Sequence, residues 1–484
     1  MEKLNKPSMN SVLFTKNQLL LLFVFFACLF SRIVTSIYYI EDIDSLRFAL
    51  SLYDYNLSNL QPHFPGYPVF CFFAIIFYAI IPSMGISFSI IGGISTFVII
   101  YFCLRLGNTD IKSPEGFVVS MIIFFNPMIW LMGNRYMPDL MGLALALPIL
   151  YFFILPQTRE SNLLIGFFLT GILFGTRLSY FPLVLIPLVK NLQEGINFKK
   201  ISFFALGIAV WIIPLIFMEG YDNLIESAKK QTLGHFTEFG GTAITENNWL
   251  KRIVFTVESV WSDGLGGYWL SRSWHTIFVS LFLTVLISIG IYTIAKNWKH
   301  EKYLRRIIRS IILYFLWILL FQNVIYKSRH ILPILLIFFI IITIGVEFIL
   351  SKKSRALNII TVLFVLSLAQ ITANLTIDHK KPTAVSQLKD YLINKNRVDT
   401  IISTPLINFY LKTHDVDARY INIFNNNELD KLDLNRPASN IMIVGNFNQL
   451  PFDEYKIISS KTYYHNPYVN RMWSKIETFS LSLK

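Results

Sequence analysis

The residues best suited to chemistry stand in segment 40–70, IEDIDSLRFALSLYDYNLSNLQPHFPGYPVF. Glu41, Asp42 and Asp44 follow directly after a long apolar run. A carboxylate close to a bound hydroxyl can act as a general base, whereas the same three residues would also suit an ordinary acidic helix end. Asp42-x-Asp44 is also a D-x-D pattern, which binds metal in nucleotide-sugar enzymes. That chemistry requires the cytoplasmic side, and the charge pattern below predicts the opposite side for this segment.

The second candidate is the turn Gln61-Pro62-His63-Phe64-Pro65-Gly66-Tyr67-Pro68. Prolines fix the backbone and glycine permits a sharp turn. This composition predicts a rigid loop. Such a loop could present His63 and Tyr67 to a ligand, or it could serve only as a structural elbow.

Basic side chains form the third candidate. They stand at predicted turns on the same side as the acidic segment: Arg135, Arg177, Lys327, Arg329 and His330. Charge-assisted contacts from such groups stabilise a phosphate leaving group, although each residue alone would also suit the membrane interface. Asp139 follows Pro138, where it would pair with Arg135, cap a helix, or contact an acceptor or the base.

The elements that position these residues are membrane helices. Of the 484 residues 54% are hydrophobic and only 15% are charged, and the mean hydropathy is +0.51. Soluble domains carry about 25% charged residues, so a water-soluble globule is excluded. The apolar runs are long and continuous, which indicates helices in a lipid bilayer and not a β-barrel. The net charge is +13, and the basic residues cluster in short segments between these runs. This clustering follows the positive-inside rule of membrane proteins, so it argues against nucleic acid as a partner.

The basic segments set the predicted orientation, with the N-terminus inside. Eleven spans satisfy the pattern. The apolar stretch 68–83 then stays outside as an interfacial or re-entrant helix, the alternative being a full crossing. Run 162–190 is short for two crossings and predicts two short helices that turn at Gly175-Thr176-Arg177. The segments placed inside are 1–17, 105–115, 156–161, 190–200, 296–309 and 351–355.

The composition changes near Lys380. Residues 378–484 predict a small soluble α/β domain, with Ile441–Val444 as a buried strand, attached to a transmembrane domain of residues 1–377. External loops are expected at 41–85 and 219–272. The second loop is rich in glycine and aromatic residues, which predicts a flexible element over the site. No metal-ligand spacing is present, so no cofactor is predicted, although a divalent metal remains compatible with the sequence. The four candidate ligands of that loop are expected to be solvated: His235, Glu238, Asp263 and His275.

Several of these motifs together resemble a known family. Asp44 followed by LRFALSLYDY and then QPHFPGYP is similar to the first-loop signature of integral-membrane GT-C glycosyltransferases. It is most like the protein O-mannosyltransferase-like branch, glycosyltransferase family 39, in which a PHPPGYP-type motif has proline where this chain has Phe64. Asn126–Trp130, with Arg135 and Asp139 after it, and the K-x-R-H-x-L-P segment Lys327–Pro333 agree with the same family.

The resemblance implies a GT-C fold and a hexosyltransferase of the bacterial inner membrane. Its donor would be a polyprenyl-phosphate-linked sugar, bound between helices with the phosphate at the outer surface. An acidic residue of the first loop would act as base, and the sugar would pass with inversion to a hydroxyl of a protein, lipid or glycan. The spacing to PHFPGYP assigns the base to Asp44, with Asp42 as runner-up.

Two other functions remain as alternatives. A multi-pass transporter or lipid-linked glycan flippase would carry ionisable residues in the middle of helices and broken helices in paired halves. A cell-envelope polymerase or ligase would also use a polyprenyl donor and a long outer loop. The early acidic segment followed by PHFPGYP, together with the terminal soluble domain, favours the glycosyltransferase.

Overall fold

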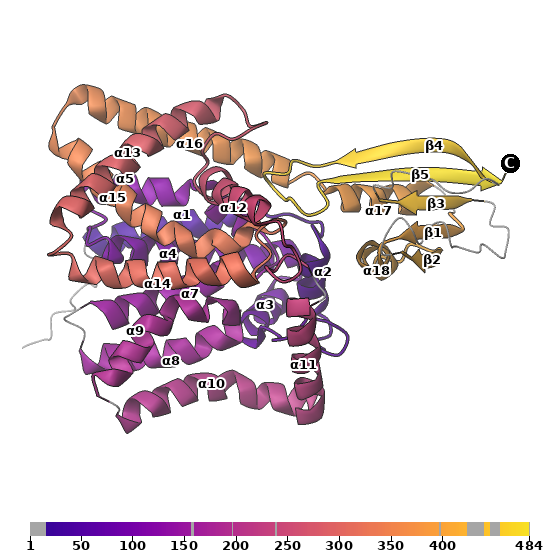
Figure 1. Cartoon of the computed structure of the whole chain (residues 1–484), viewed down its shortest axis with the longest axis horizontal. Coiled ribbons are helices and arrows are strands. Elements are labelled where there is room, and N and C mark those ends of the chain that lie inside the picture. The colour runs from indigo at the N-terminus through magenta and orange to yellow at the C-terminus, as the bar shows by residue number, and fades with distance from the viewer. Residues whose placement is uncertain are drawn as a thin grey trace, which may run out of the picture.

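A computed structural model describes residues 16–155, 159–195, 197–237, 240–395, 398–423, 440–445 and 455–483. Most of the predicted basic segment 1–17, part of 156–161, and Glu238 therefore lie outside the described residues. The chain forms a helical bundle with a smaller α/β domain at one end (Figure 1). We call this end of the bundle, where the C-terminal domain is attached, the domain end.

Apolar helices make up the bundle. Within the described part of the chain, six helical segments are long and apolar enough to cross a membrane, and several others are apolar but shorter. The chain is thus a multi-pass membrane protein, while the number eleven stays a prediction. The helices are α1 (Lys16–Val34), α3 (Pro68–Ile80), α4 (Met84–Leu106), α5 (Pro114–Phe124), α6 (Pro127–Met132), α7 (Asp139–Ile154), α8 (Glu160–Arg177), α9 (Phe181–Gln193), α10 (Phe198–Glu219), α13 (His275–Asn297), α14 (Lys302–Phe321), α15 (Leu335–Ser351) and α16 (Arg355–His379).

Helix α3 stays at the domain end of the bundle. Its 13 residues extend for only about 20 Å, less than the roughly 30 Å of a hydrocarbon core. Its C-terminal end leads to Gly85 of α4, where an added Cβ would lie 2.2 Å from the carbonyl oxygen of Ile37, just beyond α1. Tyr67, at its other end, packs with Phe48 of the first loop. This arrangement favours the interfacial or re-entrant prediction over a crossing.

Run 162–190 forms two helices, as predicted. Helix α8 ends at Arg177, a short 3-10 turn η1 (Leu178–Tyr180) follows, and α9 leads back. Helix α8 packs closely against α10. A Cβ added at Gly171 would lie 2.6 Å from the backbone of Gly207, so the contact requires glycine. The turn brings Arg177 to the domain end.

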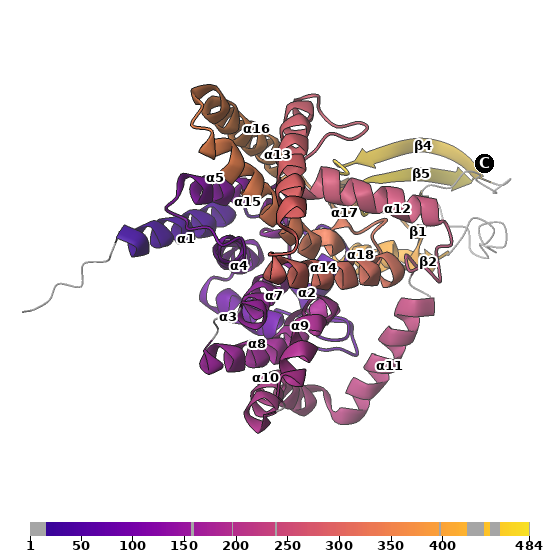
Figure 2. The ribbon, with the colours of Figure 1, turned by 60° about the vertical axis from the view of Figure 1, so that its left-hand side comes forward.

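Segment 219–272 differs from the flexible loop that we expected, because most of it is helical. It contains α11 (Tyr221–Thr237), α12 (Trp249–Glu258) and the π-helical turn η2 (Ser259–Gly264). In α12 the exposed residues Trp249, Ile253 and Val257 repeat every four positions and form an apolar stripe, and Arg252 and Thr256 beside this stripe are buried. Figure 2 shows α11 and α12 at the domain end.

The C-terminal domain is a mixed sheet with two helices. It comprises α17 (Ala384–Lys395), β1 (Thr400–Ser403), α18 (Pro405–Thr413), β2 (Arg419–Asn422), β3 (Ile441–Val444), β4 (Tyr455–Tyr464) and β5 (Lys475–Leu483). The strand order is β2-β1-β3-β5-β4. Strand β1 pairs in parallel with β2 and β3, and Ile401 lies opposite Met442, whereas β5 pairs antiparallel with β3 and β4. The predicted buried strand Ile441–Val444 is confirmed as β3.

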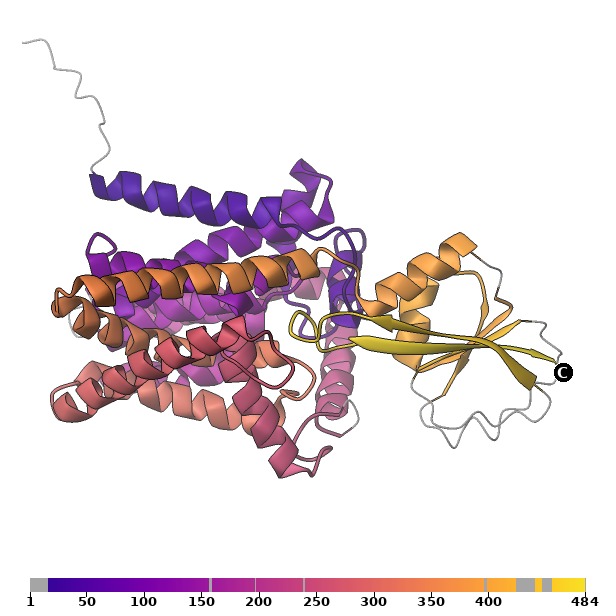
Figure 3. The ribbon, with the colours of Figure 1, turned by 90° about the horizontal axis from the view of Figure 1, so that it is seen from above.

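Two connections fasten this domain to the bundle. Ile43 and Leu46 of α2 (Ile43–Leu50), in the first loop, belong to the same apolar core as Leu388, Ile401 and other residues of the C-terminal domain. The loop 465–474 between β4 and β5 reaches back into the bundle (Figure 3). The first loop therefore lies between the two parts of the molecule.

Candidate active site

Asp42 begins the short helix that carries Asp44. The Asp42 carboxylate accepts a hydrogen bond from the Ser45 backbone N–H at 2.9 Å, which makes it the N-cap of α2. Asp44 then stands in the first turn, where the helix dipole favours a negative charge. One face of α2 packs in the C-terminal domain core, while Phe48 and Ala49 pack with α3 and α4. Asp44 is thus held on a helix that is fixed from both sides.

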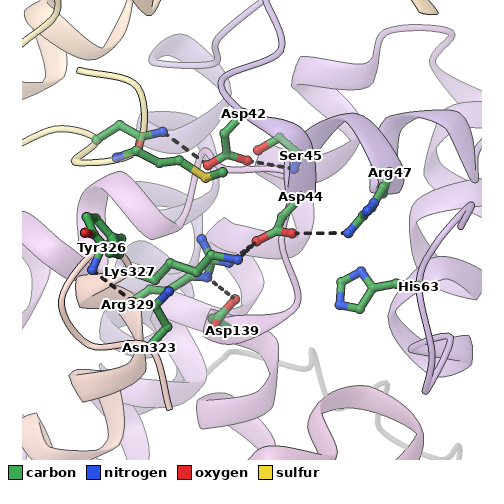
Figure 4. A network of polar contacts seen from close by, with 12 residues as sticks. Asp42, Asp44, Ser45, Arg47, His63, Asp139, Asn323, Tyr326, Lys327 and Arg329 are labelled. Atoms are coloured by element: carbon green, nitrogen blue, oxygen red, sulfur yellow. Dashed lines mark hydrogen bonds and ion pairs between the residues drawn. The ribbon is translucent and has the colours of Figure 1, made fainter. Parts of the chain in front are cut away.

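Three cations surround Asp44 (Figure 4). Lys327 Nζ and Arg329 Nη2 both lie 2.5 Å from Asp44 Oδ2, and Arg47 Nη1 lies 3.9 Å from Oδ1. Lys327 and Arg329 stand at the start of the 3-10 helix η3 (Ser328–Ile334), after α14. The first loop and the K-x-R-H-x-L-P segment, 283 residues apart in sequence, therefore meet at one carboxylate.

Asp139 extends the cluster. Arg177 Nη2 lies 2.8 Å from Asp139 Oδ1, and Arg329 Nε lies 3.7 Å from Oδ2, so Arg329 bridges both aspartates. Arg177 also donates a hydrogen bond to the Tyr67 hydroxyl at 3.2 Å, and His63 Nε2 lies 3.1 Å from the same hydroxyl. Gly66, with φ +83°, provides the turn before Tyr67. The predicted residues Asp44, His63, Gly66, Tyr67, Asp139, Arg177, Lys327 and Arg329 thus come together.

This Asp44 cluster carries more positive than negative charge. Four cations, Arg47, Arg177, Lys327 and Arg329, face two carboxylates, Asp44 and Asp139, which leaves a surplus of two positive charges. Several buried nitrogens here have no hydrogen-bond partner within the described residues: Nε of Arg47 and Arg177, and Nδ1 of His63 and His330. A surplus of charge with free donors is the chemistry of an anion site.

Proton affinities around Asp44 agree with this arrangement. Burial alone would raise the pKa of Asp44, but Lys327 and Arg329 outweigh it and hold the pKa well below its usual range. Burial lowers the pKa of His63 to about 3, and the nearby Arg47 adds to the effect. His63 is therefore neutral at pH 7, and the positive surplus comes from the four cations.

Arg135 lies outside this cluster. Its Nε is 3.4 Å from Glu41 Oε2, and its guanidinium also donates to the Val469 carbonyl in the β4–β5 loop. His379 Nε2 lies 2.9 Å from Glu41 Oε1. Burial would raise the pKa of Glu41, but Arg135 and His379 lower it to about 2. One predicted role of Asp139, the pairing with Arg135, is wrong, because Arg135 contacts Glu41 and the β4–β5 loop while Asp139 faces Arg177. We call Glu41, Arg135 and His379 the Glu41 network.

A further network joins the β4–β5 loop to segment 219–272. Arg471 Nη2 lies 2.8 Å from Asp263 Oδ2 and 3.3 Å from Glu258 Oε1, and Arg272 Nη2 lies 3.9 Å from Asp263 Oδ1. Asp263 is buried, so the expectation that it is solvated is wrong. The π-helical turn directs it toward the incoming loop. We call Asp263, Glu258, Arg272 and Arg471 the Asp263 network.

Sequence reasoning missed some residues of the site. Arg47 is three positions after Asp44, a helical spacing that could have revealed it. Asn470 Nδ2 lies 3.3 Å from Asp42 Oδ2 across 428 residues of sequence, and no local pattern points to that contact. Asp42 therefore has a partner on each carboxylate oxygen. Within the described stretches, no group of three or more His, Cys, Asp and Glu side chains could hold a metal ion.

Comparison with known proteins identifies the fold. ArnT from Cupriavidus metallidurans bound to undecaprenyl phosphate matches with a TM-score of 0.54, at 7% identity, over 96% of this chain and 97% of that chain. The apo state of the same protein matches with a TM-score of 0.51 at 9% identity over the same shares. The chain has the GT-C fold. No family model and no curated protein matches the sequence.

The GT-C fold confirms the predicted architecture, a polytopic helical membrane domain followed by a small C-terminal α/β domain. Both structures carry the name ArnT, so membership of the family 39 branch remains a prediction.

Proposed function

We propose that this GT-C protein is a glycosyltransferase that moves a sugar from a polyprenyl-phosphate-linked donor to a hydroxyl acceptor on the extracytoplasmic side. The observation that carries the proposal is the surplus of two positive charges in the Asp44 cluster, buried at the domain end of a membrane bundle. The ArnT structure bound to undecaprenyl phosphate supports the class of lipid.

The size of the charge surplus fits the leaving group better than the donor. A polyprenyl-phosphate sugar is a phosphodiester with one negative charge. Once the sugar has left, the lipid phosphate is a monoester with a charge of about −1.5 to −2 at neutral pH. A site with two spare positive charges therefore stabilises the phosphate more as the bond breaks, and this difference is what lowers the barrier.

Asp44 is the proposed base. The acceptor oxygen forms a bond to the anomeric carbon while the bond from that carbon to the phosphate oxygen breaks, and the acceptor proton passes to Asp44. Attack opposite the phosphate inverts the configuration. In the free protein Lys327 and Arg329 hold the pKa of Asp44 low, which makes it a weak base. A bound phosphate would compete for both cations, and the freed carboxylate would become more basic.

The predicted orientation puts this site outside the cell. The basic segments 296–309 and 351–355 lie next to helix ends remote from the domain end (Figure 1). If these segments stay inside, as the positive-inside rule requires, the Asp44 cluster and the C-terminal domain face the extracytoplasmic side. On that side of the membrane the available sugar donors are lipid-linked, because nucleotide sugars are found in the cytoplasm.

Turnover of a defined donor tests the proposal. The protein in nanodiscs would be incubated with a panel of undecaprenyl-phosphate sugars, and sugar release to water or to added acceptors would be measured. Asp44→Asn should lower turnover by about 100- to 10,000-fold, the usual effect of losing a general base. Asp42→Asn is the matched control, because asparagine caps a helix as well as aspartate does, so its turnover should fall less than about 10-fold.

Binding of undecaprenyl phosphate separates a chemical role from a structural one. Asp44→Asn should bind this lipid at least as tightly as the wild type, because the charge surplus rises from two to three. Two results would contradict the proposal: turnover that is equal in both variants and the wild type, or lipid-linked glycan flux across vesicles with no transfer at all.

A further inference from the structure

A cavity lies next to the β4–β5 loop, the same loop that contacts Asp42 through Asn470. Its volume is about 470 Å³. It is bounded by the end of α16, the start of α13 and the first residues of the β4–β5 loop. Its polar and aromatic lining includes Arg272, Gln370, Asn374, Gln387, His465 and Tyr468.

A polar stripe on α16 forms one wall. Gln370, Asn374 and Asp378 are spaced four residues apart, so they lie on one helix face. Gln370 and Asn374 are exposed, and Gln370 lies about 12 Å along the helix from Asp378. Amide groups exposed on an apolar membrane helix are costly in contact with hydrocarbon. A polar group bound beside the helix would offset that cost.

Buried atoms of the cavity wall that lack a hydrogen-bond partner are a second indication of a ligand, independent of the polar stripe on α16. His465 Nε2 and Arg272 Nε are buried without a hydrogen-bond partner in the described part of the chain, and both residues line the cavity. Buried donors of this kind are normally satisfied. A bound molecule with hydroxyl groups would satisfy them.

The charge balance of the wall points to a neutral ligand. Lys381 pairs with Asp378 at 2.7 Å. Arg272 lies 3.9 Å from Asp263, and its guanidinium lies over the Tyr468 ring at 4.1 Å. Among the described residues of this wall, Lys381 and Arg272 both have an acidic partner, in contrast to the surplus in the Asp44 cluster. The groups that remain include amides, the imidazoles of His275 and His465, and the rings of Tyr464 and Tyr468, which hydrogen-bond hydroxyls and pack against sugar rings.

The cavity adjoins the proposed catalytic site. Asn466 lines the cavity, and Asn470 of the same loop contacts Asp42. Asp378 precedes His379, which contacts Glu41. We propose that this cavity binds the carbohydrate headgroup of a membrane-anchored acceptor, an inference that rests on the proposed function. The headgroup would lie against Gln370 and Asn374, and the lipid chains would continue along α16 into the bilayer.

Binding of three defined lipids to the protein tests this inference. Native mass spectrometry would compare retention of glucosyl-diacylglycerol, phosphatidylglycerol and diacylglycerol. The variant Gln370→Leu/Asn374→Leu removes two exposed amides from an apolar helix, so it should fold. Asn358→Leu is the matched control, since Asn358 is exposed near the other end of α16. Glucosyl-diacylglycerol should be preferred, and the double variant should retain it about 10-fold less, the effect of losing one to two hydrogen bonds.

The outcomes are distinct. Preference for phosphatidylglycerol, equal retention of all three lipids, or an equal loss in Asn358→Leu would overturn the inference. Undecaprenyl phosphate, added to the same samples, should bind to every variant. If it binds to none, including the wild type, the proposed function fails, whatever the glycolipid result.

Discussion

The Asp44 cluster and the two networks beside it are built from the same residue types and differ in their charge balance. In the Glu41 network one carboxylate faces one guanidinium, and in the Asp263 network two carboxylates face two guanidiniums. The Asp44 cluster has four cations and two carboxylates. All three are buried at the junction between the bundle and the C-terminal domain.

This difference separates structural pairs from a ligand site. Removing charges from water is costly, and a buried ion offsets that cost only with a partner of opposite sign. The balanced networks satisfy this rule internally, and both attach the β4–β5 loop to the bundle. The Asp44 cluster does not, so an anion from outside would complete it. Charge balance distinguishes the two roles, whereas burial does not.

Removing the surplus charge should have the largest effect. Lys327→Met/Arg329→Met leaves Arg47, Arg177 and the two aspartates, which is a balanced set. Undecaprenyl phosphate should bind at least about 100-fold more weakly, since each hydrogen bond to a charged group contributes about 1.5–3 kcal/mol. The melting temperature should stay close to that of the wild type. Scintillation proximity binding and a thermal melt in nanodiscs measure both.

The matched control for that experiment is Arg471→Met in the Asp263 network. It leaves buried carboxylates with too few partners, so we expect a lower melting temperature and retained lipid binding. The opposite pattern, with lipid binding lost in Arg471→Met and kept in the double variant, would refute the distinction between the regions.

Neutralising Glu41 should affect stability. Because the pKa of Glu41 is about 2 in the folded protein and 4.5 ordinarily, its ionised form stabilises the fold by about 3 kcal/mol at pH 7. The unfolded chain binds the proton first, so this stability is present above about pH 4.5 and is lost as the pH falls toward 2. Glu41→Gln should melt at a lower temperature at pH 7. Its deficit should shrink in melts at pH 3, and a deficit independent of pH would show that the charge is not responsible.

The smallest expected effect on turnover comes from breaking the contact between Asn470 of the β4–β5 loop and Asp42. Asn470→Ala removes the hydrogen bond to Asp42, the N-cap of the helix that carries Asp44. Turnover should fall about 5-fold, as for a hydrogen bond of about 1 kcal/mol. Combined with Asp42→Asn, the two effects should be less than additive, because they disrupt the same contact. The control is Asn394→Ala, which replaces an exposed asparagine on α17 and should leave turnover unchanged. If the effects of Asn470→Ala and Asp42→Asn on turnover were strictly additive, the two residues would not act through one contact.

The membrane bundle, the C-terminal α/β domain and most of the Asp44 cluster could be predicted from the amino-acid sequence. Long apolar runs and basic segments are local signals with a direct physical meaning in a bilayer. The rigid turn and Asp44 lie within 24 residues of each other, and the cations stand at turns that the span pattern brings to one face. Segment 219–272 was harder, because glycines and aromatic residues obscured the helical repeat of α12.

The pairing of the charged groups, in contrast, depends on the three-dimensional fold. From sequence, Arg135 was the pairing partner predicted for Asp139, and only the spacing to PHFPGYP favoured Asp44 over Asp42 as the base. The fold directs Arg177 to Asp139 and Arg135 to Glu41, and it uses Asp42 as a helix cap. The partners that fix these choices, such as Val469 and Asn470, lie more than 300 residues away in sequence. Coulomb attraction does not distinguish between like charges, so the choice of partner depends on where the backbone brings each side chain.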